Sequence, residues 1–146
     1  RTQKSVQWYA RKELATVLSR QGRFGEAAVQ FERIFDEQED GPDSPGGAAI
    51  EALIDRAAHH RRSGNYRHAE ADARLARKIA SSRLPADSWV VALADVELAR
   101  AVLAQGDSAP ARERLSDATD RLRDTLHPDD LRVVRLDALV QARSTR

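Results

Sequence analysis

The sequence predicts an all-α fold, an α-solenoid of three helix-turn-helix repeats followed by one further helix. Two observations predict it. Gly22, Gly64 and Gly106 lie 42 residues apart, and each follows a stretch rich in helix-forming residues. Alanines recur with the same step, at positions 15, 57 and 99 and again at 27, 69 and 111. A helix-ending glycine between two small residues in fixed register indicates a pair of helices repeated along the chain.

Apolar residues at steps of three and four place seven helices along the chain. The predicted spans are 6–20, 24–38, a third helix from about 45 to 62, 66–82, 88–104, a sixth helix beginning after 108, and 129–143. In the fourth span the stripe is made only of alanines, which lets a neighbouring helix approach closely. The expected N-cap residues are Asp43 or Ser44, then Asp87, then Asp107 or Ser108.

These helices are expected to form a single domain over residues 1–146. Its repeats span about 5–40, 45–84 and 87–126, and the terminal helix at 129–143 covers the open end of the stack. The sequence contains no methionine, so we expect it to be a fragment of a longer protein.

Composition excludes several classes of protein. The chain has 24 basic and 23 acidic residues, so no overall field favours nucleic acid or a membrane surface. It has no cysteine, which excludes disulfides and thiolate chemistry and is compatible with the cytoplasm. No apolar run approaches the roughly 20 residues needed to span a bilayer. The abundance of Ala, Arg and Asp suggests a bacterial gene.

Residues that could carry catalysis or bind a metal are few. His59 and His60 are neighbours on one helix and project about 100° apart, so both cannot face one ligand well. His127 precedes a proline in a connector. The sequence shows neither a nucleophile elbow nor a glycine-rich phosphate loop. We therefore expect surface or groove-edge histidines, no catalytic residues, no metal and no cofactor.

With these residues in place, the chain resembles the tetratricopeptide repeat family. The family's small, glycine, aromatic, alanine and large apolar positions are filled in the first repeat by Ala15, Gly22, Phe24, Ala27 and Phe31. The later repeats diverge, because Ala73 replaces the large residue and Ser108 the aromatic one. The 42-residue step exceeds the usual 34 and is similar to the longer repeats of kinesin light chains and their bacterial relatives.

The resemblance implies a concave groove lined by the first helix of each repeat. The positions that would face inward are Lys12, Thr16, Arg20, Ile54, Ala58, Arg61, Arg62, Val96, Arg100 and Leu103, with Arg135, Leu139 and Arg143 added by the last helix. Apolar side chains fringed by arginine would suit an extended peptide with apolar and acidic residues, or a free carboxylate. An ordinary solvated surface is the alternative. Trp8 and Trp89 could stack on a ligand, although packing between repeats is favoured.

Two classes of function follow. The first is a protein-interaction scaffold that holds a peptide or partner segment in the groove, without direct binding of nucleic acid or membrane; a homo-oligomer is compatible with it. The second is the sensor or dimerisation domain of a bacterial regulator whose DNA-binding or catalytic domain lies outside this chain.

Overall fold

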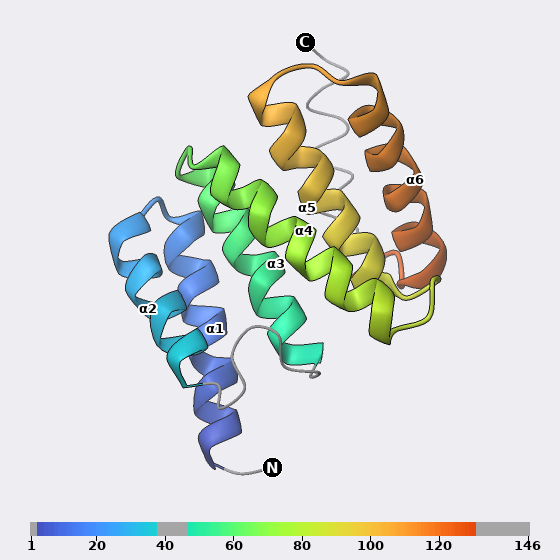
Figure 1. Cartoon of the computed structure of the whole chain (residues 1–146). Helices are drawn as coiled ribbons and strands as arrows, with labels where there is room; N and C mark the ends of the chain where they lie inside the picture. Colours follow the sequence, from blue (N-terminus) through green and yellow to red (C-terminus); the bar gives the residue numbers. More distant parts are fainter. Residues whose placement is uncertain (1–2, 38–46, 131–146) are drawn as a thin grey trace.

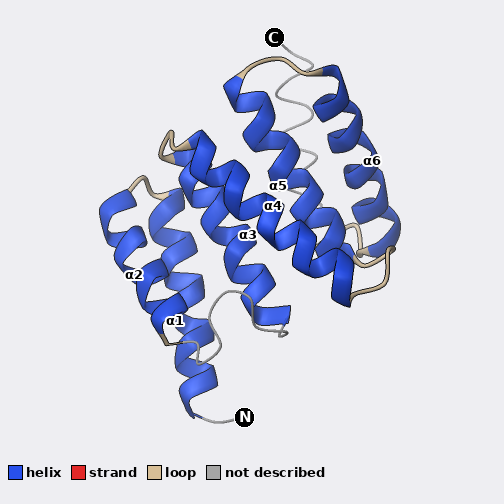
Figure 2. Ribbon diagram, in the orientation of Figure 1, coloured by secondary structure: helices blue, strands red, loops and turns tan. Residues whose placement is uncertain are grey.

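The computed structural model describes residues 3–37 and 47–130, and every regular element in these ranges is an α-helix (Figures 1 and 2). The helices are α1 (Gln3–Arg20), α2 (Phe24–Asp36), α3 (Gly47–Arg62), α4 (Tyr66–Arg83), α5 (Trp89–Gln105) and α6 (Ala109–Thr125). The predicted all-α class is therefore confirmed for the described residues. The predicted helix at 129–143 lies outside them, except for residues 129 and 130, which are not helical.

Tight turns at the predicted glycines join the helices in pairs. Gly22 has a φ of 77° and Gly64 a φ of 86°, in the left-handed region that residues with a Cβ rarely adopt. Beyond each glycine the backbone turns back on the preceding helix. The amide of Arg23 donates to the carbonyl of Leu18 at 2.9 Å, and the amide of Asn65 donates to that of His60 at 2.8 Å. Both turns thus have the hydrogen bond of a Schellman motif.

The helix pairs pack side by side along the chain (Figure 1). The first helices of the pairs form a continuous row, because α1 contacts α3 and α3 contacts α5. The second helix of each pair contacts its own partner, and α2 and α4 also contact the first helix of the next pair. Direct packing of α2 on α4 or of α4 on α6 does not occur among the described residues.

Recurring alanines bring the helices close together. Ala15, Ala57 and Ala99 are at most 1% exposed, and in α4 the residues Ala69, Ala73, Ala76 and Ala80 are all fully buried. Larger apolar side chains fill the space beside them, including Phe31 and Ile34 in the first pair and Ile50 and Leu53 in the second. The alanine stripe predicted from the sequence is therefore confirmed as a buried contact surface.

The close approach at α4 gives a first test of the register. Ala69→Leu should lower the free energy of unfolding by roughly 1 to 3 kcal/mol, because the added methyl and methylene groups have no space at a fully buried site. Ala86 is exposed in the connector before α5, so Ala86→Leu should have little effect. Urea unfolding curves compare the two variants, and equal midpoints would show that Ala69 does not lie at a helix contact.

Two local predictions are corrected by the structure. Ser88, rather than Asp87, caps α5, since its hydroxyl accepts a hydrogen bond from the amide of Val90 at 3.2 Å. Trp8 packs mainly within its own helix pair: its indole donates to the carbonyl of Ile34 at 3.1 Å, and the ring joins the α1–α2 core. Its side chain is thus unavailable for stacking on a ligand.

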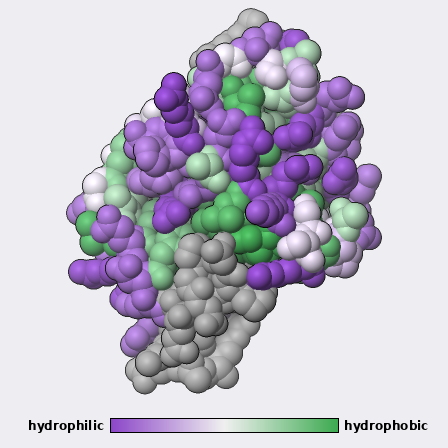
Figure 3. All heavy atoms as spheres, in the orientation of Figure 1, coloured by the Kyte–Doolittle hydropathy of each residue, from purple (hydrophilic) through white to green (hydrophobic). Residues whose placement is uncertain are grey.

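The face of the molecule seen in Figure 3 is mostly hydrophilic, with hydrophobic residues visible between the hydrophilic ones. Among the described residues, the helices are too short or too polar to cross a membrane.

Candidate functional site

The residues predicted to line a groove have very different exposures. Of those in the described ranges, the buried ones are Lys12, Thr16, Ile54, Ala58 and Val96, the half-buried ones are Arg61, Arg62, Arg100 and Leu103, and Arg20 is exposed. Arg135, Leu139 and Arg143 lie outside the described residues. Ile54 and Val96 join the packed clusters between helices, so the apolar strip expected along the groove is not a surface feature.

Lys12 forms a link between the first two pairs rather than an open ligand-binding group. Its Nζ atom donates to Oδ2 of Asp55 on α3 at 3.1 Å and to Oε1 of Glu13 at 3.3 Å. Burial opposes the charge of Lys12, but Asp55 and Glu13 outweigh it, so the pKa of Lys12 is raised and its ammonium group stays charged.

Two arginines share one carboxylate between α3 and α5. Nε of Arg61 lies 3.2 Å from Oε2 of Glu97, and Nη1 of Arg100 lies 3.4 Å from Oε1 of the same residue. Glu97 is only 8% exposed. Arg61 and Arg100 therefore lie close together, and a carboxylate of the protein itself already neutralises part of their charge.

Arg62 is placed differently from its neighbour. Its guanidinium donates through Nη1 to the hydroxyl of Ser19 on α1 at 3.3 Å, and in the described part of the chain it forms no ion pair. Burial lowers the pKa of Arg62, and the positive charge of Arg61 lowers it further. Arg61, Arg62 and Arg100 thus bring three positive charges to the row of first helices, beside the carboxylate of Glu97. We call these four residues the arginine cluster.

A buried serine contacts Arg62, and a buried histidine contacts that serine. The sequence predicted neither contact. Ser19 is 1% exposed and His59 is 3% exposed, and Nδ1 of His59 lies 3.3 Å from the Ser19 hydroxyl. The prediction of surface or groove-edge histidines is therefore wrong for His59, whose ring packs on Phe31 with a centroid distance of 5.2 Å. The repeat register could have indicated the place of Ser19. It lies 42 residues before Arg61, so the two residues hold equivalent positions in successive repeats.

The Ser19–His59 pair is not arranged as a nucleophile and its base. Burial, together with the nearby positive groups of His60, Arg62 and Arg56, lowers the pKa of His59 to about 4. A histidine with so low a pKa is a weak base near neutral pH, and a substrate cannot reach a serine hydroxyl that is almost fully enclosed. The pair therefore positions Arg62 instead of activating Ser19.

Other histidines lie between α3 and α4. The ring of His60 is 5.3 Å from that of His68, and its Nε2 atom is 3.7 Å from Oδ2 of Asp72. Arg56 already binds Asp72 through two hydrogen bonds, at 2.7 and 2.9 Å. Within the described residues, no group of three or more histidine, aspartate or glutamate side chains could hold a metal ion.

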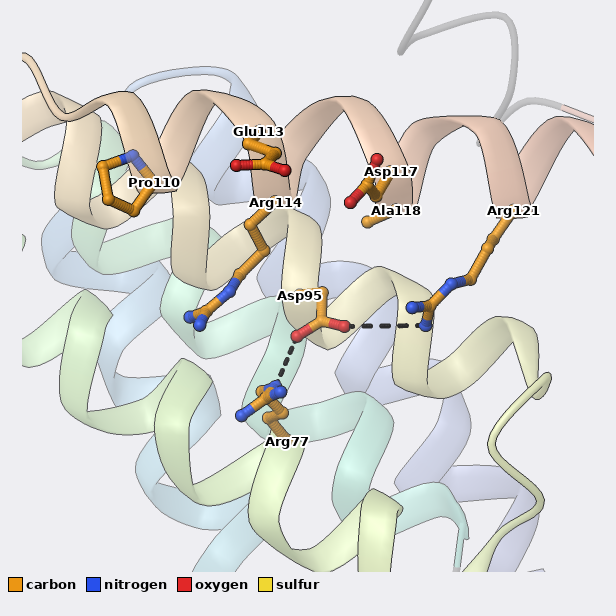
Figure 4. Close-up of a pocket in the computed structure, with 8 residues that line it drawn as sticks. All are labelled: Arg77, Asp95, Pro110, Glu113, Arg114, Asp117, Ala118 and Arg121. Carbon is orange, nitrogen blue, oxygen red and sulfur yellow. Dashed lines mark hydrogen bonds and ion pairs between the residues drawn. The ribbon is translucent and has the colours of Figure 1, made fainter.

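A hollow lies in the furrow between α4 and α6 (Figure 4). A cavity of about 250 Å³ there has Asp95 of α5 at its floor. Arg77 from α4 and Arg121 from α6 approach this carboxylate from the two walls, at 2.5 and 4.0 Å. Arg114 points into the same space in Figure 4.

Charges in this furrow largely balance. The cavity over Asp95 is lined by three arginines and by three carboxylates, those of Asp95, Glu113 and Asp117. A neighbouring cavity of about 460 Å³ is lined by Arg74, Arg77 and Lys78, but Arg74 and Arg77 are paired with Glu70 and Asp95. Within the described part of the chain, most of the cations that line the furrow are therefore matched by carboxylates of the protein itself.

Comparison with known proteins finds no similar protein: no family profile, no curated protein and no solved structure matches the chain.

Proposed function

We propose that this chain is a protein-interaction scaffold that binds an acidic segment, or a free terminal carboxylate, of a partner protein at the arginine cluster. The observation that carries the proposal is the environment of Arg62. Among the described residues, the hydrogen bond of this half-buried guanidinium goes to a serine hydroxyl, while Arg61 and Arg100 share Glu97. A carboxylate from outside would give Arg62 an anionic partner beside the carboxylate of Glu97 that Arg61 already binds.

The arrangement of the helices supports this role. The row formed by α1, α3 and α5 carries the arginine cluster, and the row is continuous because α1 contacts α3 and α3 contacts α5. We propose that the pairs form a right-handed solenoid of the tetratricopeptide type, in which the first helices line one extended surface. Such a surface would let a bound segment contact several helices at once. The absence of cysteine is compatible with the cytoplasmic location that we include in the proposal.

Partial burial makes the interaction strong enough to measure. A hydrogen bond to a charged group contributes about 1.5 to 3 kcal/mol when one partner is ionised, which corresponds to roughly a tenfold change in affinity or more. Arg62 is already half-buried, so part of its hydration is lost before a partner arrives. An incoming carboxylate therefore finds a guanidinium that the hydroxyl of Ser19 helps to hold in place.

Selection from a peptide library tests the proposal, because it does not require an identified partner. Random peptides with free carboxyl termini are selected on the wild-type chain, and the enriched sequences are compared with those from Arg62→Gln. We expect acidic residues or the terminal carboxylate to be enriched on the wild type and lost on Arg62→Gln. Arg33→Gln is the matched control, because Arg33 is exposed on α2, away from the cluster. Enrichment that is the same on Arg62→Gln would contradict the proposal.

A further inference from the structure

The outward face of α1 is apolar and uncovered. Val6, Leu14 and Val17 are 57%, 46% and 46% exposed, and Ala10 between them is also exposed. These residues recur at steps of four, four and three, so they share one side of the helix. Trp8 and Ala15 lie on the other side and face the core, and Leu18 at the edge of the stripe is also buried there. Four small or apolar residues on one exposed helical stripe suggest a contact surface.

The repeat register shows what this stripe does elsewhere in the chain. Adding 84 to the positions of Val6, Ala10 and Leu14 gives Val90, Ala94 and Leu98 of α5, which are the same three residue types. In α5 they are buried, with exposures of 8%, 0% and 1%. The fourth position, Val17, corresponds to Ala101, which is also fully buried. The same face is therefore covered in α5 and open in α1.

The element that covers this face in α5 is the preceding helix pair. Val90 and Ala94 belong to the cluster that joins α5 to α3 and α4, and Leu98 packs with Ala57 of α3 and Ala73 of α4. The position of Ala10 is also buried in the second pair, because its equivalent there, Ala52 of α3, joins the core of α1 and α2. In both later pairs, the first helix thus uses this face to dock on the pair before it.

We infer that the outward face of α1 is a docking surface for a further antiparallel helix pair, of the kind that α3 and α4 present to α5. The continuity of the interface identifies the occupant. α1 carries the residues with which α5 meets an alanine-lined helix pair, so the fitting partner has apolar and alanine residues at the positions of Leu53, Ala73 and Ala76. A second copy of this chain could not offer its α3–α4 surface to α1, because α5 already covers that surface.

Thiol labelling tests the inference directly, because the chain contains no cysteine. Leu14→Cys introduces a single thiol on the proposed surface, and Val29→Cys is the control. Val29 is 45% exposed on α2, and the equivalent residues Ala71 and Glu113 are exposed as well. Each variant is prepared in the chain itself and in an extended chain in which a copy of residues 45–86 is placed directly before residue 3. This junction keeps the 42-residue step between the added glycine and Gly22.

Docking of the added pair should slow alkylation at Leu14→Cys by about tenfold or more relative to the unextended chain, since reaction then requires local opening. Alkylation at Val29→Cys should stay within about twofold. As a second measurement, Leu14→Glu/Val17→Glu should lower the thermal midpoint by about 6 °C or more in the extended chain and by about 2 °C or less in the unextended chain.

Two results would overturn the inference. One is alkylation of Leu14→Cys that is as rapid in the extended chain as in the unextended chain, whether or not the helical content rises. The added pair would then leave the outward face of α1 open. The other is reversible self-association of the unextended wild-type chain that Leu14→Glu/Val17→Glu abolishes, since the occupant would then be a second copy.

Discussion

Lowering the pH from 7.5 to 5 should destabilise the wild-type chain relative to His59→Leu by about 2 kcal/mol. The cause is the buried imidazole. Its pKa is lowered from 6.5 to about 4 in the folded protein, by burial first and then by His60, Arg62 and Arg56. Between these values the unfolded chain takes up a proton that the folded chain does not. The contribution of His59 to stability is therefore complete above about pH 6.5 and falls as the pH is lowered.

The wild type must be compared with His59→Leu because other groups also titrate between pH 7.5 and 5. Burial also lowers the pKa of His60, which adds to the loss of stability at low pH. Burial raises the pKa of Asp55 to about 6, which acts in the opposite direction between its ordinary value and pH 6. Both groups remain in His59→Leu, so the difference between the two unfolding free energies isolates His59. Chemical denaturation at several pH values measures it, and a difference that is constant from pH 7.5 to 5 would contradict the burial of a neutral imidazole.

Loss of the buried ammonium group should have an effect of similar size. Lys12→Met should lower the free energy of unfolding by about 2 to 3 kcal/mol at pH 7.5. This loss is smaller than the largest cost of breaking a buried ion pair, because the side chain of Asp55 retains 28% exposure. The methionine preserves most of the apolar contact, so the loss comes from leaving Asp55 without its cation. The effect should shrink at pH 5, where Asp55 takes up a proton more readily.

A double variant separates this role from ligand binding. Lys12→Met/Asp55→Leu should recover most of the lost stability, because replacing both members of a buried pair with apolar residues is often near neutral. Arg20→Met is the control, since Arg20 was predicted to line the same groove but is exposed at the end of α1. If Lys12→Met were as stable as Arg20→Met in urea, Lys12 would not be a link between α1 and α3.

Much of the helical framework could be predicted from the sequence because its signals are local. A glycine that adopts a positive φ ends a helix wherever the chain folds, and the spacing of Gly22 and Gly64 placed the turns correctly. α1 and α3 end at the predicted residues, Arg20 and Arg62, but α1 begins at Gln3, three residues before its predicted start. α2 ends at Asp36, two residues before its predicted limit. Ser88 rather than Asp87 became the cap because neighbouring residues of similar capping preference cannot be separated without the backbone geometry.

The candidate site was harder to predict because its properties depend on contacts between helices. The family resemblance placed Ile54 and Val96 on the side of the groove, but only packing of successive pairs shows that they are buried. Sequence spacing likewise could not show that Arg61 and Arg100 share Glu97 whereas Arg62 donates to the hydroxyl of Ser19. His59 was misplaced for the same reason, since its enclosure comes from α1 and α2.

The arginine cluster makes the central claim testable through two substitutions that should act in opposite directions. An acidic peptide with a free carboxyl terminus, taken from the library selection, is titrated against the wild type, Arg62→Gln and Glu97→Gln by fluorescence anisotropy. Glu97 competes with an incoming carboxylate for Arg61 and Arg100, so its neutralisation should tighten binding about three- to tenfold. Arg62→Gln should weaken binding by about tenfold. Circular dichroism confirms that both variants keep the helical content of the wild type. Opposite shifts are the result that the proposed function predicts, and weaker binding by Glu97→Gln, or unchanged binding by Arg62→Gln, would contradict it.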